Sequence, residues 1–177
     1  FFLVFSYRAR VACPSCTTKR SLLFREQVRE IVHPLNHLHV TFTIPKLLRG
    51  FLRLNRRLGK LLLRSAWQGY LCEVLQICDG LGGGIFCLQT YGNLFNYHPH
   101  VHALVLSGLV RVGPFHELKG CSATDVAVRF HSRFLTALQK QEDLDSDEVE
   151  LLMSWNHNSG FNVHTGRPLD SAIGEVI

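Results

Sequence analysis

The sequence predicts an α+β protein in which helices flank an antiparallel β-sheet. Runs of β-forming residues and runs with helical periodicity follow one another in the order β-α-β-β-α-α-β, which suits an antiparallel sheet with helices packed on one side. Two of the predicted strands are separated by a short loop and can therefore pair as a hairpin. A hydrophobic content of 46% over 177 residues is enough to bury a core.

The first predicted helix covers residues 21–32. Leu22, Leu23 and Val28 form its apolar side, and charged residues occupy the opposite side. The helix should end at His33-Pro34, because the residue before a proline is driven out of the helical region.

A strand and a long helical stretch follow. The β-branched run at 39–44 predicts a strand that Pro45 ends. Residues 46–78 carry leucines at helical spacing, which predicts a long helix that is interrupted near Gly59 or Gly69.

The second half of the chain contains the predicted hairpin and the remaining helices. Glycines at 80 and 82–84 predict a turn before it, and Gly92-Asn93 predict the turn within it. Residues 107–120 read as a turn region with one short strand. The predicted strands are at 85–91, 96–106 and 160–164, and the predicted helices are at 124–141 and 146–156.

Three histidines alternate along the second strand of the hairpin. Alternate side chains of a strand share a face, so His98, His100 and His102 should project together while Val101 anchors the strand from the opposite face. Neutral imidazoles held in this way can bind a divalent cation. The alternative interpretation is a polar strand face whose histidines have only structural partners.

A metal site with open positions needs about three protein ligands. His100 and His102 would supply two, and the carbonyl oxygen of Gln89, on the neighbouring strand of the hairpin, could supply the third. His98 and His164 are the alternatives. This mixture of nitrogen and oxygen ligands suits Mg²⁺, Mn²⁺ or Zn²⁺, and a divalent ion beside a basic helix can polarise a phosphodiester.

Positive charge is concentrated in segment 46–64, which contains no acidic residue, whereas acids gather at 142–150. The net charge of +5 is therefore less informative than its distribution. A basic surface of this kind suits a polyanion such as nucleic acid, and an ordinary solvated helix face is the alternative. The predicted DNA-contacting residues are Lys46, Arg49, Arg53, Arg56, Arg57 and Lys60.

The cysteine pattern predicts metal binding at one place only. Cys13-Pro14-Ser15-Cys16 is half of a zinc site, because tetrahedral zinc needs four ligands and such a turn supplies two. The other cysteines lie mostly among apolar residues and do not resemble a secreted disulfide framework. No apolar run is long enough to predict a transmembrane helix. Neither end reads as a natural terminus, and we expect a fragment.

Five sequence blocks together cover nearly the whole chain. They are CPSCTTKR at 13–20, HLHVTFTIPKLLR at 37–49, AWQGYL at 66–71, LQTYGNLFNYHPHVHALV at 88–105 and LLMSWNHNSGFNVH at 151–164. In this order the blocks resemble the transposases of bacterial rolling-circle insertion sequences, which are the two-tyrosine branch of the HUH (His-hydrophobic-His) endonuclease superfamily. The fourth and fifth blocks are the most specific.

The resemblance implies an HUH endonuclease-like fold, with a partial zinc-binding, DNA-contacting segment and linking helix at 1–34 and a transposase domain at 35–177. His100 and His102 would be the metal pair, binding Mg²⁺ or Mn²⁺, and Cys13 with Cys16 would bind zinc. The family reaction cleaves and rejoins single-stranded DNA. The metal polarises the phosphate, and a tyrosine attacks it to leave a 5′-phosphotyrosine. The expected partner is single-stranded insertion-sequence ends in the bacterial cytoplasm, at the nucleoid, with neither a membrane nor a small-molecule substrate.

The sequence departs from the family pattern at the nucleophile. The family's catalytic tyrosines lie on a helix beyond the last matching block, and none of Tyr7, Tyr70, Tyr91 or Tyr97 occupies that place. Tyr97 should also point to the face opposite the histidines. We therefore expect a chain that binds metal and DNA without cleaving DNA by itself. A non-catalytic nucleic-acid-binding module and an inactive transposase remnant are the alternative hypotheses.

Overall fold

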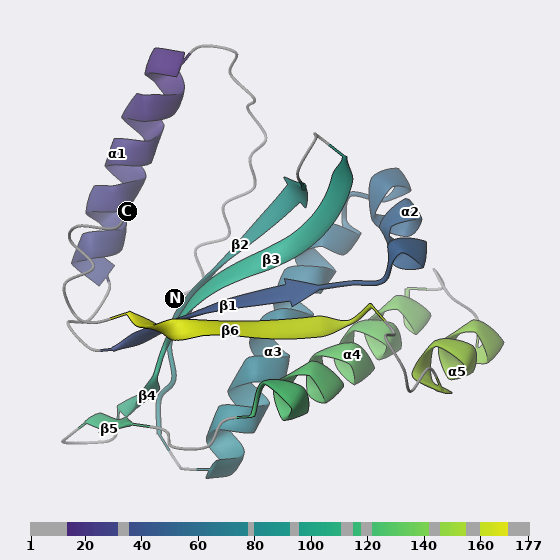
Figure 1. Cartoon of the computed structure of the whole chain (residues 1–177). Helices are drawn as coiled ribbons and strands as arrows, with labels where there is room; N and C mark the ends of the chain where they lie inside the picture. Colours follow the sequence, from purple (N-terminus) through teal and green to yellow (C-terminus); the bar gives the residue numbers. More distant parts are fainter. Residues whose placement is uncertain are drawn as a thin grey trace.

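A computed structural model describes residues 14–31, 36–77, 80–92, 96–110, 115–117, 122–141, 146–154 and 160–169 (Figure 1). The predicted order of the principal elements is confirmed, with a short extra strand pair before α4. The elements are α1 (Pro14–Ile31), β1 (His37–Thr43), α2 (Lys46–Leu54), α3 (Leu58–Ile77), β2 (Gly84–Tyr91), β3 (Tyr97–Leu106), β4 (Gly108–Val110), β5 (Phe115–Glu117), α4 (Ala123–Gln139), α5 (Ser146–Ser154) and β6 (Asn162–Leu169).

The principal sheet has four strands in the order β2-β3-β1-β6, and every neighbouring pair is antiparallel. The predicted α+β class and the β2–β3 hairpin are thereby confirmed. The two central strands, β1 and β3, are far apart in the sequence. The region at 107–120, predicted to hold one short strand, instead contributes the separate antiparallel pair β4–β5.

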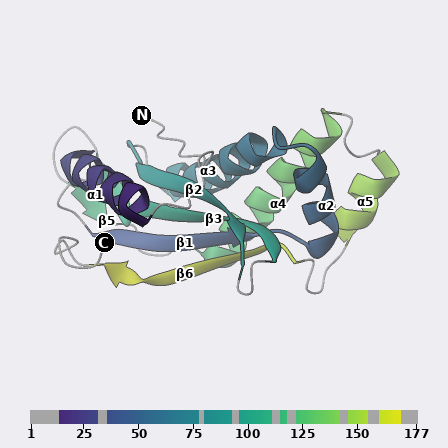
Figure 2. The same ribbon diagram turned by 90° about the horizontal axis from the view of Figure 1, so that it is seen from above.

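Helices α3 and α4 cover one face of this sheet (Figures 1 and 2). Alternate residues of the strands point into that layer, so Phe42 of β1 meets Phe130 of α4 edge to face, with ring centroids 5.2 Å apart. The strands and helices together contribute a single apolar core. Its fully buried side chains include Val40, Phe42, Leu62, Ala66, Val101, Val105, Phe130, Phe134 and Leu138.

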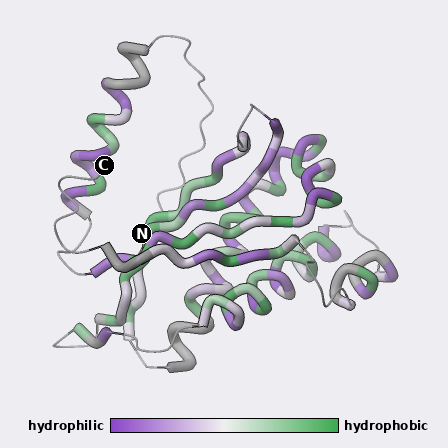
Figure 3. Tube along the Cα trace, viewed as in Figure 1, coloured by the Kyte–Doolittle hydropathy of each residue, from purple (hydrophilic) through white to green (hydrophobic). Residues whose placement is uncertain are grey.

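The intervening residues of the same strands point to the other face. Thr41 and Thr43 of β1 and His102 of β3 are half-buried there, while Gln89 of β2 and His164 of β6 are exposed. Figure 3 shows that the hydrophilic half of β3 is the half next to α2. The alternation of each strand therefore separates the apolar core from a polar face.

The long helical stretch is broken at Asn55, close to the predicted Gly59 position, and it continues through Gly69. Asn55 is extended, with φ −116° and ψ 95°, which ends α2. Its side-chain oxygen accepts a hydrogen bond from the Arg57 backbone N–H at 3.1 Å, just before α3 begins. Asparagine favours such local side-chain-to-backbone bonds over the helical interior.

The first helix differs from its prediction. It begins at Pro14 instead of residue 21. Leu22 and Leu23, predicted to lie on its apolar side, are 54% and 56% exposed, and Val28 is buried. Within the part of the chain that the structure describes, every helix is too short or too polar to cross a membrane.

Gly69 lies where α3 packs closely against α4, since a Cβ built there would stand 3.0 Å from the Cα and backbone N of Phe130. We expect Gly69→Ala to lower the free energy of unfolding by about 1–3 kcal/mol, because the backbone of α4 must move. Urea denaturation measures this change.

Gly50 of α2 provides the matched control, because a Cβ there meets nothing within 4 Å. Gly50→Ala should stabilise the protein by about 0.5–1 kcal/mol through helix propensity alone. Equal stabilisation by both substitutions would contradict the close helix contact.

Candidate functional site

The polar face of the sheet brings together the histidines of β3 and residues of its two neighbouring strands. The register places Thr41 of β1 opposite His102, and Gln89 of β2 opposite His100. His100 and His102 therefore project from the centre of the sheet, as the alternation predicts. Val101 between them is fully buried in the core, so it holds the strand from behind.

The rings of His100 and His102 meet through their Nε2 atoms, which are 3.0 Å apart. The Nδ1 atom of His100 lies 2.6 Å from the backbone carbonyl oxygen of His98. A carbonyl oxygen only accepts, so Nδ1 must carry the proton and the Nε2 of a neutral His100 must have a free lone pair. His100 is thus oriented with its lone pair directed along the polar face toward His102.

A third histidine, His39 of β1, completes the cluster. Its Nε2 lies 2.9 Å from the Nδ1 of His102, on the side of that ring away from His100. The Thr41 hydroxyl is 3.5 Å from the same Nδ1. Sequence reasoning gave His39 no role in this cluster. The sequence shows that His39 shares a strand face with Thr41, two residues later. It does not show that β1 pairs with β3.

Burial and neighbouring groups lower the pKa of two histidines on this face, His102 and His98. Burial lowers the pKa of His102, and its neighbours His100 and His39 lower it further. Burial also lowers the pKa of His98, followed by the positive charge of Arg49 and by His100. Neutral imidazoles are the form that binds metal ions.

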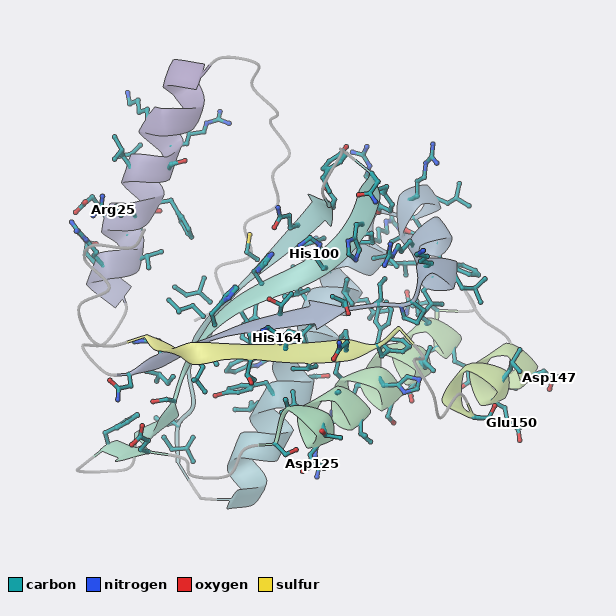
Figure 4. The ribbon with its side chains drawn as sticks, in the orientation of Figure 1. Arg25, His100, Asp125, Asp147, Glu150 and His164 are labelled. Carbon is teal, nitrogen blue, oxygen red and sulfur yellow. The ribbon has the colours of Figure 1, made fainter. Side chains whose placement is uncertain are left out.

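The other predicted ligands lie at different distances from the pair. Gln89 is exposed and stands directly across the hairpin from His100. The rings of His98 and His100 are 5.0 Å apart, and the Nε2 of His98 is buried without a hydrogen-bond partner among the described residues. His164, on β6 (Figure 4), lies opposite Thr41, so it is two strand spacings, about 10 Å, from His102. His164 is the least well placed.

Within the described ranges, no group of three or more His, Cys, Asp or Glu side chains is arranged to hold a metal ion. His39, His102 and His100 form a chain with His102 in the middle, so these three rings do not converge on one point. A third ligand to a cation at His100 and His102 would have to come from another residue, such as Gln89. Cys13 lies outside the described residues, and Cys16 is placed only by its backbone in α1. Zinc binding there stays a prediction.

The basic segment lies beside the start of β3. The charges of Arg56 and Arg53 oppose the burial that raises the pKa of Tyr97, and Arg49 acts on His98. Arg49 is half-buried, and its own pKa is lowered by that burial. The remaining predicted DNA-contacting residues are exposed on α2, the following turn and α3, namely Lys46, Arg53, Arg56, Arg57 and Lys60.

The acidic residues labelled in Figure 4 lie elsewhere. Asp125 is at the start of α4, and Asp147 and Glu150 are on α5, away from His100. The polar face of the sheet is therefore bordered by positive charge at the α2 end, a field that attracts phosphates.

Two of the described tyrosines, Tyr70 and Tyr97, pack against the core. The Tyr70 side chain is 4% exposed, and its hydroxyl donates a 2.7 Å hydrogen bond to the Leu106 carbonyl. Tyr97 packs partly against the core, on the helix side of β3, as the alternation predicts. Tyr7 lies outside the described residues.

The fold and the site together are an antiparallel sheet that carries a histidine cluster on its polar face, beside a basic helix. A protein-family model described as "Putative transposase" matches residues 83–172, just over half of the chain, from before β2 to after β6. The chain therefore belongs to this transposase family.

A curated relative points to the same family. The transposase for insertion sequence element IS801 of Pseudomonas savastanoi pv. phaseolicola is 35% identical over 98 residues. The aligned segment is 55% of this chain and 23% of that protein, so the chain matches about a quarter of its relative's length. No solved structure matched the chain.

The buried hydroxyl of Tyr70 provides a test of its structural role. We expect Tyr70→Phe to lower the free energy of unfolding by about 1–2 kcal/mol, because the Leu106 carbonyl loses its partner in the interior. Urea denaturation measures the loss. The DNA affinity of the folded variant should equal that of the wild type, and a selective loss of DNA binding would contradict the assignment.

Proposed function

We propose that this chain forms the DNA- and metal-binding part of an HUH-type transposase that acts on single-stranded insertion-sequence ends in the bacterial cytoplasm. The observation that supports this most strongly is the contact of His100 and His102 through their Nε2 atoms beside a basic helix. Membership of the transposase family supports DNA as the partner.

The two histidines fit a divalent cation. Metal–nitrogen bonds of about 2.0–2.2 Å at angles of about 90–109° separate two ligand nitrogens by about 2.8–3.6 Å. The Nε2 atoms of His100 and His102 are 3.0 Å apart. Gln89, opposite His100, is the proposed oxygen ligand, and His98 is the alternative. Mg²⁺ or Mn²⁺ in this position would polarise a phosphodiester and stabilise charge on its oxygens.

The surrounding residues would hold the DNA. The exposed cations of α2 and α3 would neutralise the backbone of a single strand, and Arg49 would place positive charge next to His98. Tyr70 and Tyr97 are not assigned as the nucleophile, since Tyr70 is buried and Tyr97 faces the helices. The proposal therefore covers DNA binding and phosphate polarisation.

A nucleic-acid-binding module without a metal site is the second candidate, because the basic segment alone is sufficient for it. It would bind DNA with steep salt dependence and without regard to metal or to the histidines. An inactive remnant would bind neither ligand.

Replacing both histidines tests the metal site. We expect the wild type to bind about one equivalent of Mn²⁺, and the double substitution His100→Ala with His102→Ala to abolish that binding, since the protein then lacks two of its ligands. Isothermal titration measures the metal, and single-stranded DNA binding is measured with and without Mn²⁺.

His164→Ala is the matched control, because His164 projects from the same sheet but lies two strands from His102. It should bind Mn²⁺ like the wild type. Mn²⁺ binding that survives the double substitution would refute the site. DNA binding that is indifferent to Mn²⁺ in all three proteins would favour the metal-free module.

The basic surface is tested by its salt dependence. We expect Arg56→Gln with Arg57→Gln to weaken single-stranded DNA binding and to reduce the slope of log K against log salt by about 0.7 for each phosphate that the variant no longer neutralises. Both side chains are exposed, so folding should be unaffected. Lys140→Gln, an exposed lysine at the end of α4, is the control and should leave the slope unchanged. Equal slopes in all variants would remove this segment from the interface.

A further inference from the structure

We propose that His39 is a positioning residue that holds His102 in the tautomer required for metal binding. This inference rests on the proposed function, because it concerns a cation at His100 and His102. His39 lies outside the region that the family model matches, and its role follows from the pairing of β1 with β3.

The contact between His39 and His102 has the geometry of a hydrogen bond in the plane of both rings. The ring planes are within 6° of each other, and the ring centroids are 5.1 Å apart. The nitrogens nevertheless approach to 2.9 Å. Rings stacked face to face could not combine these values, so the two rings meet edge to edge, with the lone pair of one directed at the N–H of the other.

Without a cation, the partners determine where each proton lies. His100 donates from Nδ1 to the His98 carbonyl, so its Nε2 accepts from the Nε2–H of His102. The Nδ1 of His102 is then an acceptor, and it accepts from the Nε2–H of His39. Each neutral ring carries one proton, and the three hydrogen bonds run in one direction along the chain.

With a cation, His102 must present a bare Nε2 and carry its proton on Nδ1. That proton is then donated to the Nε2 of His39, whose own proton moves to its Nδ1. Both rings stay neutral, and no proton is gained or lost overall. His39 is exposed, so water can carry out the exchange.

His39 is therefore placed to be the hydrogen-bond partner of His102, on the side of that ring away from the cation. Histidines that bind metals almost always donate their other N–H to such a partner, which fixes the ring and raises its basicity. The His98 carbonyl does this for His100. For His102 the competing acceptor is the Thr41 hydroxyl, but at 3.5 Å it is at the limit of a hydrogen bond.

The test compares Zn²⁺ affinity in four proteins by competition with a chromophoric chelator. Every protein in this test also carries Cys13→Ser with Cys16→Ser, so that the predicted zinc ligands there do not take up the metal. We expect His39→Leu to bind Zn²⁺ about 10–100-fold more weakly than the wild type. His39→Gln, which keeps an acceptor near the position of Nε2, should recover most of the affinity. Thr41→Val should change it little. Urea denaturation should show that all four proteins are folded.

The second measurement is the tautomer of His102 from ¹⁵N NMR of the imidazole rings. The proton should lie on Nε2 without Zn²⁺ and on Nδ1 with it, a shift that a purely structural histidine would not show. Unchanged affinity in His39→Leu, or equal losses in His39→Leu and His39→Gln, would overturn the role of His39. Zn²⁺ binding that survives His100→Ala with His102→Ala would instead overturn the proposed function, and this inference with it.

Discussion

The pairing of β1 with β3 is the constraint on which both the core and the site depend. Its register sets Phe42 against Val101 on the helix side of the sheet and Thr41 against His102 on the other. A shift of one residue would exchange the two faces, which would expose Phe42 and bury imidazoles among leucines. The burial of Phe42 between the sheet and α4 therefore fixes the position of His39 relative to His102.

This arrangement lets a polar cluster exist without weakening the core. Burying imidazoles in an apolar interior would require a partner for every nitrogen. Here the cluster lies on the polar face, where His39 is exposed and His102 is half-buried, and the chain of three rings ends on a backbone carbonyl. The apolar contacts that position His100 are made by Val101, on the opposite side of the strand.

Local sequence patterns predicted those features of the site that depend on a single strand or a single hairpin. Alternation placed the three histidines on one face, and the short loop placed Gln89 opposite His100. The pairing of β1 with β3 was beyond such reasoning, because it joins residues as far apart as His39 and His102 and is decided by how strands share one core. Helical periodicity likewise could not show that Leu22 would be exposed, since periodicity does not show whether a neighbouring element covers that face.

The charges around the cluster connect its two proposed ligands. The pKa values of His98 and His102 are lowered by burial, by Arg49 and by neighbouring histidines. No carboxylate is among the causes of these two shifts. A cation held by neutral imidazoles and an amide keeps its full charge and is repelled by the neighbouring arginines. The phosphates of bound DNA would offset the positive charges of the cation and of the arginines. The cation and the DNA would therefore each strengthen the binding of the other by the same factor. The proposed site would therefore bind its cation most tightly when DNA is present.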